Sequence, residues 1–227
     1  MPDDKNIWEH FQNEAADVFT GSESRLSFLS AGFRAGEKVL DIGVGNGRLE
    51  ELALSRGADV YSLDPGERTI ENLRARLGLG EKAAVGGSDR IPFPSDHFDA
   101  VVMSEVLEHL APDAMLATLA EVRRVLRPGG RFLGTVPCNE TLADQQALCP
   151  KCGEKFHRWG HRQSFTPESL SASLSGRFSA VSTEKKFFVT WGALNWKGKL
   201  QGAFNYALFY CGLLSDGRQN IYFNCKK

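Results

Sequence analysis

The hydrophobic positions along the first part of the chain alternate between short apolar runs and longer stretches with helical spacing. Runs of strand length occupy residues 38–42, 59–64, 83–85, 98–103 and 131–136. Between them, residues 48–54, 68–77 and 114–126 place apolar side chains on one helical face. This alternation with short connections predicts a parallel sheet covered by helices on both faces.

The segments on either side of this pattern read differently. Residues 6–30 predict amphipathic helices, and Thr166 followed by Pro167 is typical of a helix start. Strands are expected at 178–189 and 219–225, with an aromatic helix or substrate-facing lid over 191–214. We therefore expect one domain over residues 1–227, divided into a helical lid (1–30), a cofactor-binding core (38–137), an insertion (138–164) and a C-terminal part (165–227).

Composition narrows the possible partners and compartment. The 227 residues carry a net charge of -1, which gives nucleic acid no electrostatic support as a partner. The start of the chain lacks a basic, apolar leader, and no apolar run reaches the roughly 20 residues of a membrane span. We expect a cytoplasmic protein whose five cysteines are thiols or metal ligands. The oligomeric state cannot be read from these features.

A glycine-rich loop between the first strand and the first core helix predicts a ligand site. Gly43, Gly45 and Gly47 allow backbone to approach a ligand closely and to point N–H groups at it. The dinucleotide-binding fingerprint requires a further glycine where Arg48 stands, so its spacing fails. Asp41 would repel a pyrophosphate, but it tolerates a cofactor that carries a sulfonium and an ammonium.

A second acid follows the next strand. Asp64 lies at about the 20-residue separation expected for a carboxylate that accepts hydrogen bonds from ribose hydroxyls. The glycine loop and Asp64 together predict an adenosine-containing cofactor without phosphate.

Residues 39–47, Val-Leu-Asp-Ile-Gly-Val-Gly-Asn-Gly, resemble the first motif of class I S-adenosylmethionine-dependent methyltransferases. Further matches follow in the family's order at residues 87–93, 98–102, 106–110 and 126–130. The resemblance implies a Rossmann-like, seven-stranded, mostly parallel sheet with helices on both faces, N-terminal helices and a Cys/His-rich insertion after the fifth strand.

The resemblance also implies a set of residues that bind S-adenosylmethionine. Gly43 and Gly45 would line its methionine part, Asp64 would hold the ribose, and Ser88 and Asp89 would lie beside the adenine. The family often has an acid where Gly87 stands, so Asp89 is expected to supply that contact. The full implied set is Asp41, Gly43, Val44, Gly45, Asp64, Pro65, Ser88, Asp89, Ser104 and Glu105.

The expected function is methyl transfer from S-adenosylmethionine to a small-molecule, glycan or lipid-intermediate acceptor. Residues 104–107, Ser-Glu-Val-Leu, do not resemble the signature of amino-group methylation, which favours an oxygen or carbon acceptor. The alternatives are a nucleotide-dependent oxidoreductase and a binding protein that retains the fold without turnover. No catalytic residue is assigned, although His109, His157 and His161 are candidate bases for a hydroxyl acceptor.

The insertion also carries a metal-ligand pattern. Cys149 and Cys152 have the spacing of a zinc knuckle, and His157 and His161 follow with three residues between them. These four ligands predict a structural zinc ion that would order a segment too polar to bury a core. An alternative places Cys138 among the ligands, and another directs His161 into the active site.

Overall fold

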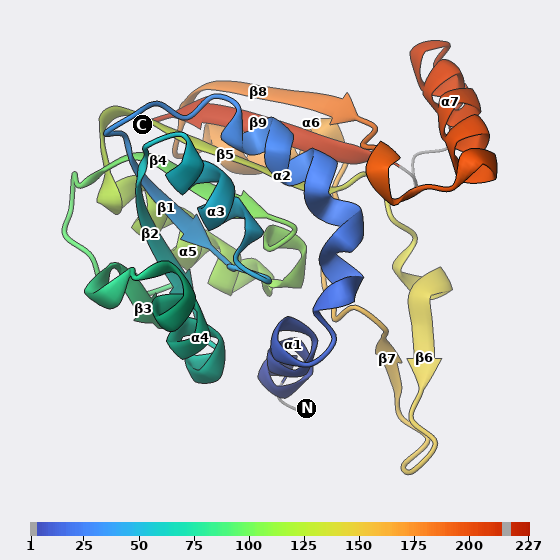
Figure 1. Cartoon of the computed structure of the whole chain (residues 1–227), viewed down its shortest axis with the longest axis horizontal. Coiled ribbons are helices and arrows are strands. Elements are labelled where there is room, and N and C mark those ends of the chain that lie inside the picture. The colour runs from blue at the N-terminus through green and yellow to red at the C-terminus, as the bar shows by residue number, and fades with distance from the viewer. Residues whose placement is uncertain (1–3, 215–218) are drawn as a thin grey trace.

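A computed structural model of the chain describes residues 4–214 and 219–227. Seven strands form one sheet in the order β3-β2-β1-β4-β5-β9-β8 (Figure 1). They are β1 Lys38–Ile42, β2 Asp59–Asp64, β3 Ala83–Val85, β4 Phe98–Ser104, β5 Leu126–Pro137, β8 Ser179–Lys186 and β9 Asn220–Lys226. β9 runs antiparallel to both neighbours, and the other pairings are parallel. The predicted seven-stranded, mostly parallel sheet is confirmed.

Helices cover both faces of this sheet, as predicted. α2 (Glu23–Ser30), α3 (Arg48–Ser55) and α4 (Glu67–Leu77) pack on one face through a core that includes Leu29, Leu49 and Ile70. α5 (Pro112–Val125) and α6 (Pro167–Ser175) pack on the other. Thr166 caps α6 through a capping box with Ser169, which confirms the start predicted there.

The strand after α5 begins earlier than the sequence predicts, at Leu126 and not at residue 131. The Arg-Pro-Gly-Gly segment at residues 127–130 lies within β5, where the register with β4 shifts from Phe98↔Leu126 to Ala100↔Arg131. Gly129 adopts a φ of 76°, a conformation that glycine takes without strain. The residues between the predicted helix and the predicted strand therefore form an irregularity inside β5.

The first helices of the chain and the insertion after β5 both reach the carboxyl end of the parallel strands, where their residues line one cavity. α1 (Asp4–Asn13) is followed by a 3-10 helix (Ala16–Ser22), so the predicted N-terminal helices are present. The first three residues, which bear on the prediction about a leader, lie outside the described part. The insertion contains a hairpin of β6 (Gln146–Leu148) and β7 (Lys155–His157) that projects from the body (Figure 1).

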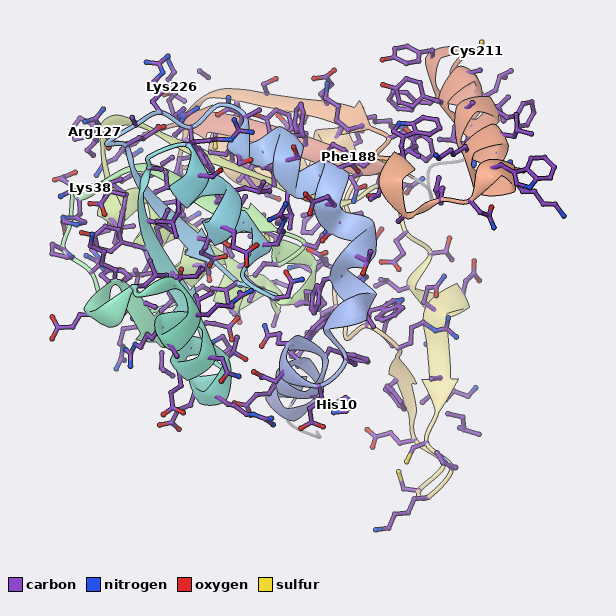
Figure 2. The ribbon with its side chains drawn as sticks, viewed as in Figure 1. His10, Lys38, Arg127, Phe188, Cys211 and Lys226 are labelled. Atoms are coloured by element: carbon purple, nitrogen blue, oxygen red, sulfur yellow. The ribbon has the colours of Figure 1, made fainter. Side chains whose placement is uncertain are left out.

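The aromatic segment near the C-terminus forms α7 (Trp196–Tyr210), which stands apart from the sheet (Figure 1). Trp196 is 67% exposed and Tyr210 72%. Figure 2 shows Cys211 at the outer end of this helix, whereas Phe188 lies near α2 and packs on Phe28. Across the described ranges, no helix is both long and apolar enough to cross a membrane.

Candidate active site

A large cavity of about 750 Å³ lies over the carboxyl ends of β1, β2 and β4. This is the point where the chain order reverses across the sheet, from β1 outward to β2 on one side and to β4 on the other. Ligands of open α/β sheets bind at such points. The cavity is lined by all ten residues that the resemblance implies for the cofactor.

The glycine loop forms the floor of this cavity. Gly43 has a φ of 84° and its N–H donates to the carbonyl of Leu63 over 2.9 Å. A Cβ atom at Gly43 would lie 2.6 Å from Cγ2 of Val106, so any side chain would clash as well as strain the backbone. Gly45 has a φ of 55°. Glycine is therefore required here by the backbone conformation, and the absence of a side chain leaves the floor of the cavity open to a ligand.

Asp64 stands at the end of β2 with its carboxylate held by backbone N–H groups. Gly66 N donates to Oδ1 over 2.8 Å, and Val44 N donates to Oδ2 over 3.2 Å. Gln12 of α1 donates a third hydrogen bond, from Nε2 to Oδ2 over 3.1 Å. Burial raises the pKa of Asp64 above its usual value, and these hydrogen bonds oppose that shift.

Two further acids lie beneath the loop. Asp41 is 4% exposed, and its pKa is raised by burial and then by the nearby charges of Glu50 and Asp64. Glu50 is fully buried and accepts a hydrogen bond from Ser62 Oγ over 2.9 Å; burial raises its pKa to about 7. The glycine-loop end of the cavity therefore has the Asp41 carboxyl group in its lining, with Glu50 buried behind it.

The opposite wall carries Ser88 and Asp89. Ser88 Oγ lies 2.8 Å from Thr118 Oγ1, which ties this loop to α5. A Cβ atom at Gly87 would meet Oδ1 of Asp89 at 2.5 Å. The Asp89 carboxylate thus occupies the space beside Gly87 where the family often has an acidic side chain.

The end of β4 closes the third side. Ser104 Oγ accepts from Arg25 Nε over 3.1 Å, and Asn220 Nδ2 donates to both carboxylate oxygens of Glu105, each over 3.1 Å. Arg25 Nη1 lies 3.9 Å from Glu105 Oε2. Glu105 has a φ of 58°, a costly conformation for a residue with a side chain, and such strain concentrates at functional sites.

α1 lies across the mouth of the cavity. At one end Gln12 reaches Asp64, and at the other Trp8 packs edge-on against His109 with 5.0 Å between ring centroids. Phe11 packs near Trp159 of the insertion at 6.3 Å. α1 thereby connects the Asp64 end of the cavity with the end lined by His109, Trp159 and His161.

That second end contains a group of histidines and carboxylates. His161 Nδ1 is hydrogen-bonded to Oε2 of Glu140, and His157 Nε2 lies 3.6 Å from Oε1 of the same residue. Burial, and then the neighbouring His161, lower the pKa of His157. Glu108 is 1% exposed, and its pKa is raised first by burial and then by the charge of Glu105. Two of the three histidines proposed as candidate bases, His109 and His161, line the cavity, whereas His157 does not.

The zinc site expected from Cys149, Cys152, His157 and His161 is not assembled. His157 and His161 come together with Glu140, but no close group of ligand atoms within the described ranges includes either cysteine. Cys149 and Cys152 lie in the turn between β6 and β7. Backbone N–H groups of Cys152 and Lys151 lower the pKa of the Cys149 thiol. The hairpin separates the two pairs because its strands extend the cysteines away from the base that carries the histidines.

The aromatic segment also falls outside the expected place. Trp191 lies in a shallower depression with Phe19 and Thr190, and no described residue of α7 lines the main cavity. α7 follows β8 at the edge of the sheet, two strands away from β5, so it cannot reach the carboxyl ends of β1 and β2. Residues of α1 and of the insertion line the main cavity instead.

A glycine loop after β1, an acid after β2 and a seven-stranded sheet with β9 reversed together define a nucleotide-binding fold of the methyltransferase class. Comparison with known proteins agrees. Residues 40–134 match the family described as "Methyltransferase domain". The matched residues, 40–134, therefore form a methyltransferase domain like that of the S-adenosylmethionine-dependent enzymes.

Individual relatives place the match in context. An uncharacterized methyltransferase of Geobacillus kaustophilus is 27% identical over 80% of this chain and 86% of its own length. The ubiquinone/menaquinone biosynthesis C-methyltransferase UbiE of Cupriavidus necator is 34% identical over 52% of this chain and 51% of its own length. The Burkholderia thailandensis 1,6-didemethyltoxoflavin-N1-methyltransferase, solved with its substrate and S-adenosylhomocysteine, has a TM-score of 0.66 at 19% identity and covers 98% of this chain and 86% of its own.

Sequence reasoning missed several residues of the cavity. Gln12 and Arg25 come from helices whose apolar pattern gave no sign of their polar contacts with Asp64 and Ser104. Glu108 was read only as part of a motif, and Glu140 was not singled out. Glu108 and His109 lie more than 45 residues before the histidines of the insertion. No sequence motif links residues so far apart, because only the folded chain brings them together.

Proposed function

We propose that the protein transfers the methyl group of S-adenosylmethionine to an oxygen or carbon atom of a small acceptor. One observation supports this proposal most strongly. The same cavity is lined by the glycine loop and Asp64 at one end and by the side-chain rings of Trp8, Trp159 and His161 at the other. Its volume of about 750 Å³ is near the upper end for small-molecule sites, which leaves room for an acceptor beside the cofactor.

The ten cofactor residues are proposed to act as the resemblance implies. Asp64 would accept from the ribose hydroxyls, Asp89 would contact the adenine amine, and Glu105 would help to close the pocket. Because the sulfonium already activates the methyl group, the enzyme mainly has to hold the acceptor in line with it and exclude water. The lid made by α1 and Trp159 supplies that exclusion.

The lining favours a small, largely apolar acceptor. Among the described residues that line the cavity, Arg25 is the single arginine or lysine, so the cavity offers little to the phosphates of a nucleic acid. UbiE is named as a C-methyltransferase of ubiquinone/menaquinone biosynthesis, and the didemethyltoxoflavin enzyme is named for transfer to N1 of its small substrate. A glycan or lipid-intermediate acceptor is compatible when its methylated part is the portion that enters the cavity.

The test is an acceptor screen with methyl-labelled S-adenosylmethionine. Pools of phenols, quinols, sugars and lipid intermediates are incubated with the purified protein, and labelled products are identified by mass spectrometry. We expect the label on oxygen or carbon of a small compound. Transfer only to RNA or protein, or binding of a nicotinamide dinucleotide in place of S-adenosylhomocysteine, would refute the proposal.

A further inference from the structure

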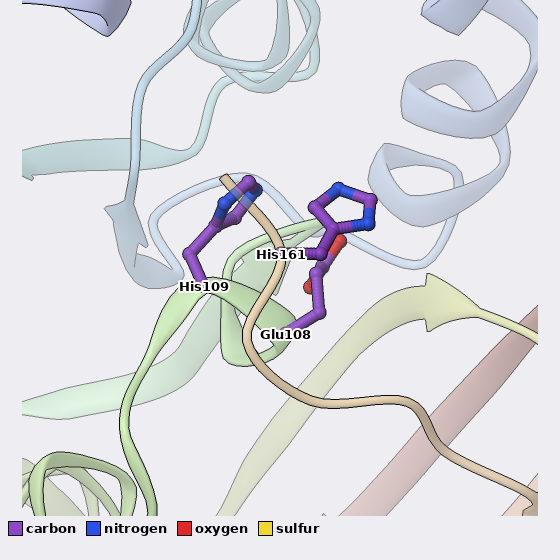
Figure 3. A group of neighbouring side chains, drawn as sticks. All are labelled: Glu108, His109 and His161. Atoms are coloured by element: carbon purple, nitrogen blue, oxygen red, sulfur yellow. The ribbon is translucent and has the colours of Figure 1, made fainter. Parts of the chain in front are cut away.

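Glu108, His109 and His161 form a compact ligand group at the acceptor end of the cavity. Each offers one ligand atom, and these atoms all lie within 4.8 Å of one another. Figure 3 shows the Glu108 carboxylate directly beside the His161 ring, with the His109 ring facing them across the group. His109 and His161 line the cavity, and Glu108 lies behind them.

The Glu108 carboxylate is buried without a hydrogen-bond partner among the described residues. It is 1% exposed, yet neither carboxylate oxygen has a hydrogen-bond partner. A buried polar group without a partner costs about 1–3 kcal/mol, and more when it is charged. Such a group in a native site calls for a ligand, an ion or a water molecule.

His161 is held in the form that can bind a cation. Its Nδ1 lies against Glu140, and a carboxylate can only accept, so Nδ1 carries the proton and Nε2 keeps its lone pair. Metal-binding histidines almost always donate their other N–H to a carboxylate or a carbonyl in this way. Glu140 is therefore a positioning residue for His161.

The neighbouring group of Glu140, His157 and His161 does not offer the same chemistry. His157 Nδ1 accepts backbone N–H bonds from Trp159 over 3.3 Å and His161 over 3.1 Å, so the ring proton of a neutral His157 is on Nε2. That N–H faces Glu140 at 3.6 Å. This group is a hydrogen-bonded support, which leaves Glu108, His109 and His161 as the ligands.

The backbone fixes the two segments that supply these ligands. The carbonyl of Glu108 accepts from Arg162 N over 2.8 Å and from Gln163 N over 3.0 Å, and Gln163 Nε2 donates to the carbonyl of Leu110 over 2.8 Å. The ligand geometry is therefore set by the fold before any ion binds, as a precise site requires.

From these observations we infer that Glu108, His109 and His161 bind a divalent first-row transition-metal ion at the acceptor end of the cavity. Two imidazoles and one carboxylate suit Zn²⁺, Fe²⁺ or Co²⁺ better than the all-oxygen ions Mg²⁺ and Ca²⁺. The ion would offset the charge that Glu105, Glu108 and Glu140 bring together, and Arg25 of α2 offsets part of the same charge.

Three protein ligands leave coordination positions open toward the cavity, where an oxygen of the methyl acceptor would bind. This role rests on the proposed function, whereas binding of the ion does not. The site therefore narrows the acceptor class to compounds with a ligating oxygen, such as a phenol or a quinol.

The test measures metal binding without any acceptor. The protein is prepared as Cys149→Ser/Cys152→Ser, so that the hairpin thiols cannot contribute, and is titrated with Co²⁺ and Zn²⁺ by equilibrium dialysis and optical spectroscopy. We expect about one equivalent of metal, and a Co²⁺ spectrum with d–d bands and no thiolate charge transfer.

Ligand variants are then made in this background. Glu108→Gln keeps the size of the side chain, and it should weaken binding at least 10-fold, as should His161→Ala. Glu140→Gln should weaken binding 10- to 100-fold, the usual effect of losing a supporting group. His10→Ala is the matched control, because His10 is exposed on α1 and pairs with Glu14; it should bind as the background does.

Folding is checked by circular dichroism, and added Co²⁺ should raise the unfolding temperature of the background but not that of Glu108→Gln. Folded background protein that binds no metal would overturn the inference. Unchanged metal affinity in both Glu108→Gln and His161→Ala would also overturn it. So would a wild-type protein that binds the metal while the Cys149→Ser/Cys152→Ser background does not. Since no methyl transfer is measured, these outcomes do not bear on the proposed function.

Discussion

Asp64 is the residue whose replacement most directly tests the cofactor site. In Asp64→Asn the side chain keeps its shape but loses its charge and one acceptor. Hydrogen bonds to a charged group contribute about 1.5–3 kcal/mol, so loss of the ribose contact should raise the Kd for S-adenosylhomocysteine roughly 10- to 150-fold. The carboxylate also holds Gly66 N and Val44 N, one of which the amide leaves unpaired.

That internal loss sets the expected change in stability. An unpaired buried N–H costs about 1–3 kcal/mol, and for a chain of this size each kcal/mol lowers the unfolding temperature by about 2–4 °C. Binding is measured by calorimetry well below that temperature, so that reduced affinity cannot be mistaken for unfolding. The two effects are therefore separable.

The matched control is Asp59→Asn at the other end of β2. Asp59 pairs with Lys82 Nζ over 2.6 Å at the surface, where such pairs contribute about 0–1 kcal/mol. Its affinity for S-adenosylhomocysteine should equal that of the wild type. An Asp64→Asn protein that is folded and binds the ligand within twofold of the wild type would show that the carboxylate does not hold the ribose.

Three further changes test the loop, the buried acids and the lid. Gly43→Ala should abolish tight cofactor binding and cost about 1–3 kcal/mol in unfolding free energy, because the new Cβ clashes with Val106 at a φ of 84°; denaturant unfolding that matches the wild type would contradict this. The pKa of Glu50 is about 7 in the folded protein against 4.5 as its usual value, so its stabilising contribution is complete below pH 4.5 and is lost as the pH rises through 7. The unfolding free energy of Glu50→Gln relative to the wild type should therefore rise by about 3 kcal/mol from pH 4.5 to pH 8. Urea titrations that give the same difference between the two proteins at both pH values would contradict this. Deletion of the residues before Ser22 should impair turnover more than folding, since α1 supplies Gln12 and Trp8 to the cavity, and none of its described side chains belongs to the buried core; full activity of the truncated protein would count against a lid.

The core of the fold was predictable because its signals are local. The run at residues 38–42 and the glycines directly after it predict a strand and a loop within ten residues of each other. The strand that ends at Asp64 is likewise predicted from its own neighbouring residues. β3, a strand of three residues, was predicted with its observed bounds at 83–85. Each of these elements depends on its own side chains more than on distant ones.

The acceptor end was not predictable in the same way. The spacing of Cys149, Cys152, His157 and His161 is regular along the chain, but the hairpin of β6 and β7 holds its two halves apart. His161 instead meets Glu108 and His109, which precede it by about 50 residues. A metal-ligand pattern in the sequence describes only the spacing of residues along the chain. The site itself depends on which backbone segments are hydrogen-bonded together.

The insertion is anchored to the core at both ends. Cys138 N donates to the carbonyl of Gln219 and Asn139 N to that of Phe165, while Arg162 N and Gln163 N hold its return to Glu108. The ends therefore stay in place whatever the length of chain between them, and the entropic cost of closing a longer loop grows only slowly with its length. Over evolution, the hairpin between residues 141 and 156 is free to lengthen, shorten or gain a new partner while Glu140 and His161 keep their positions at the cavity.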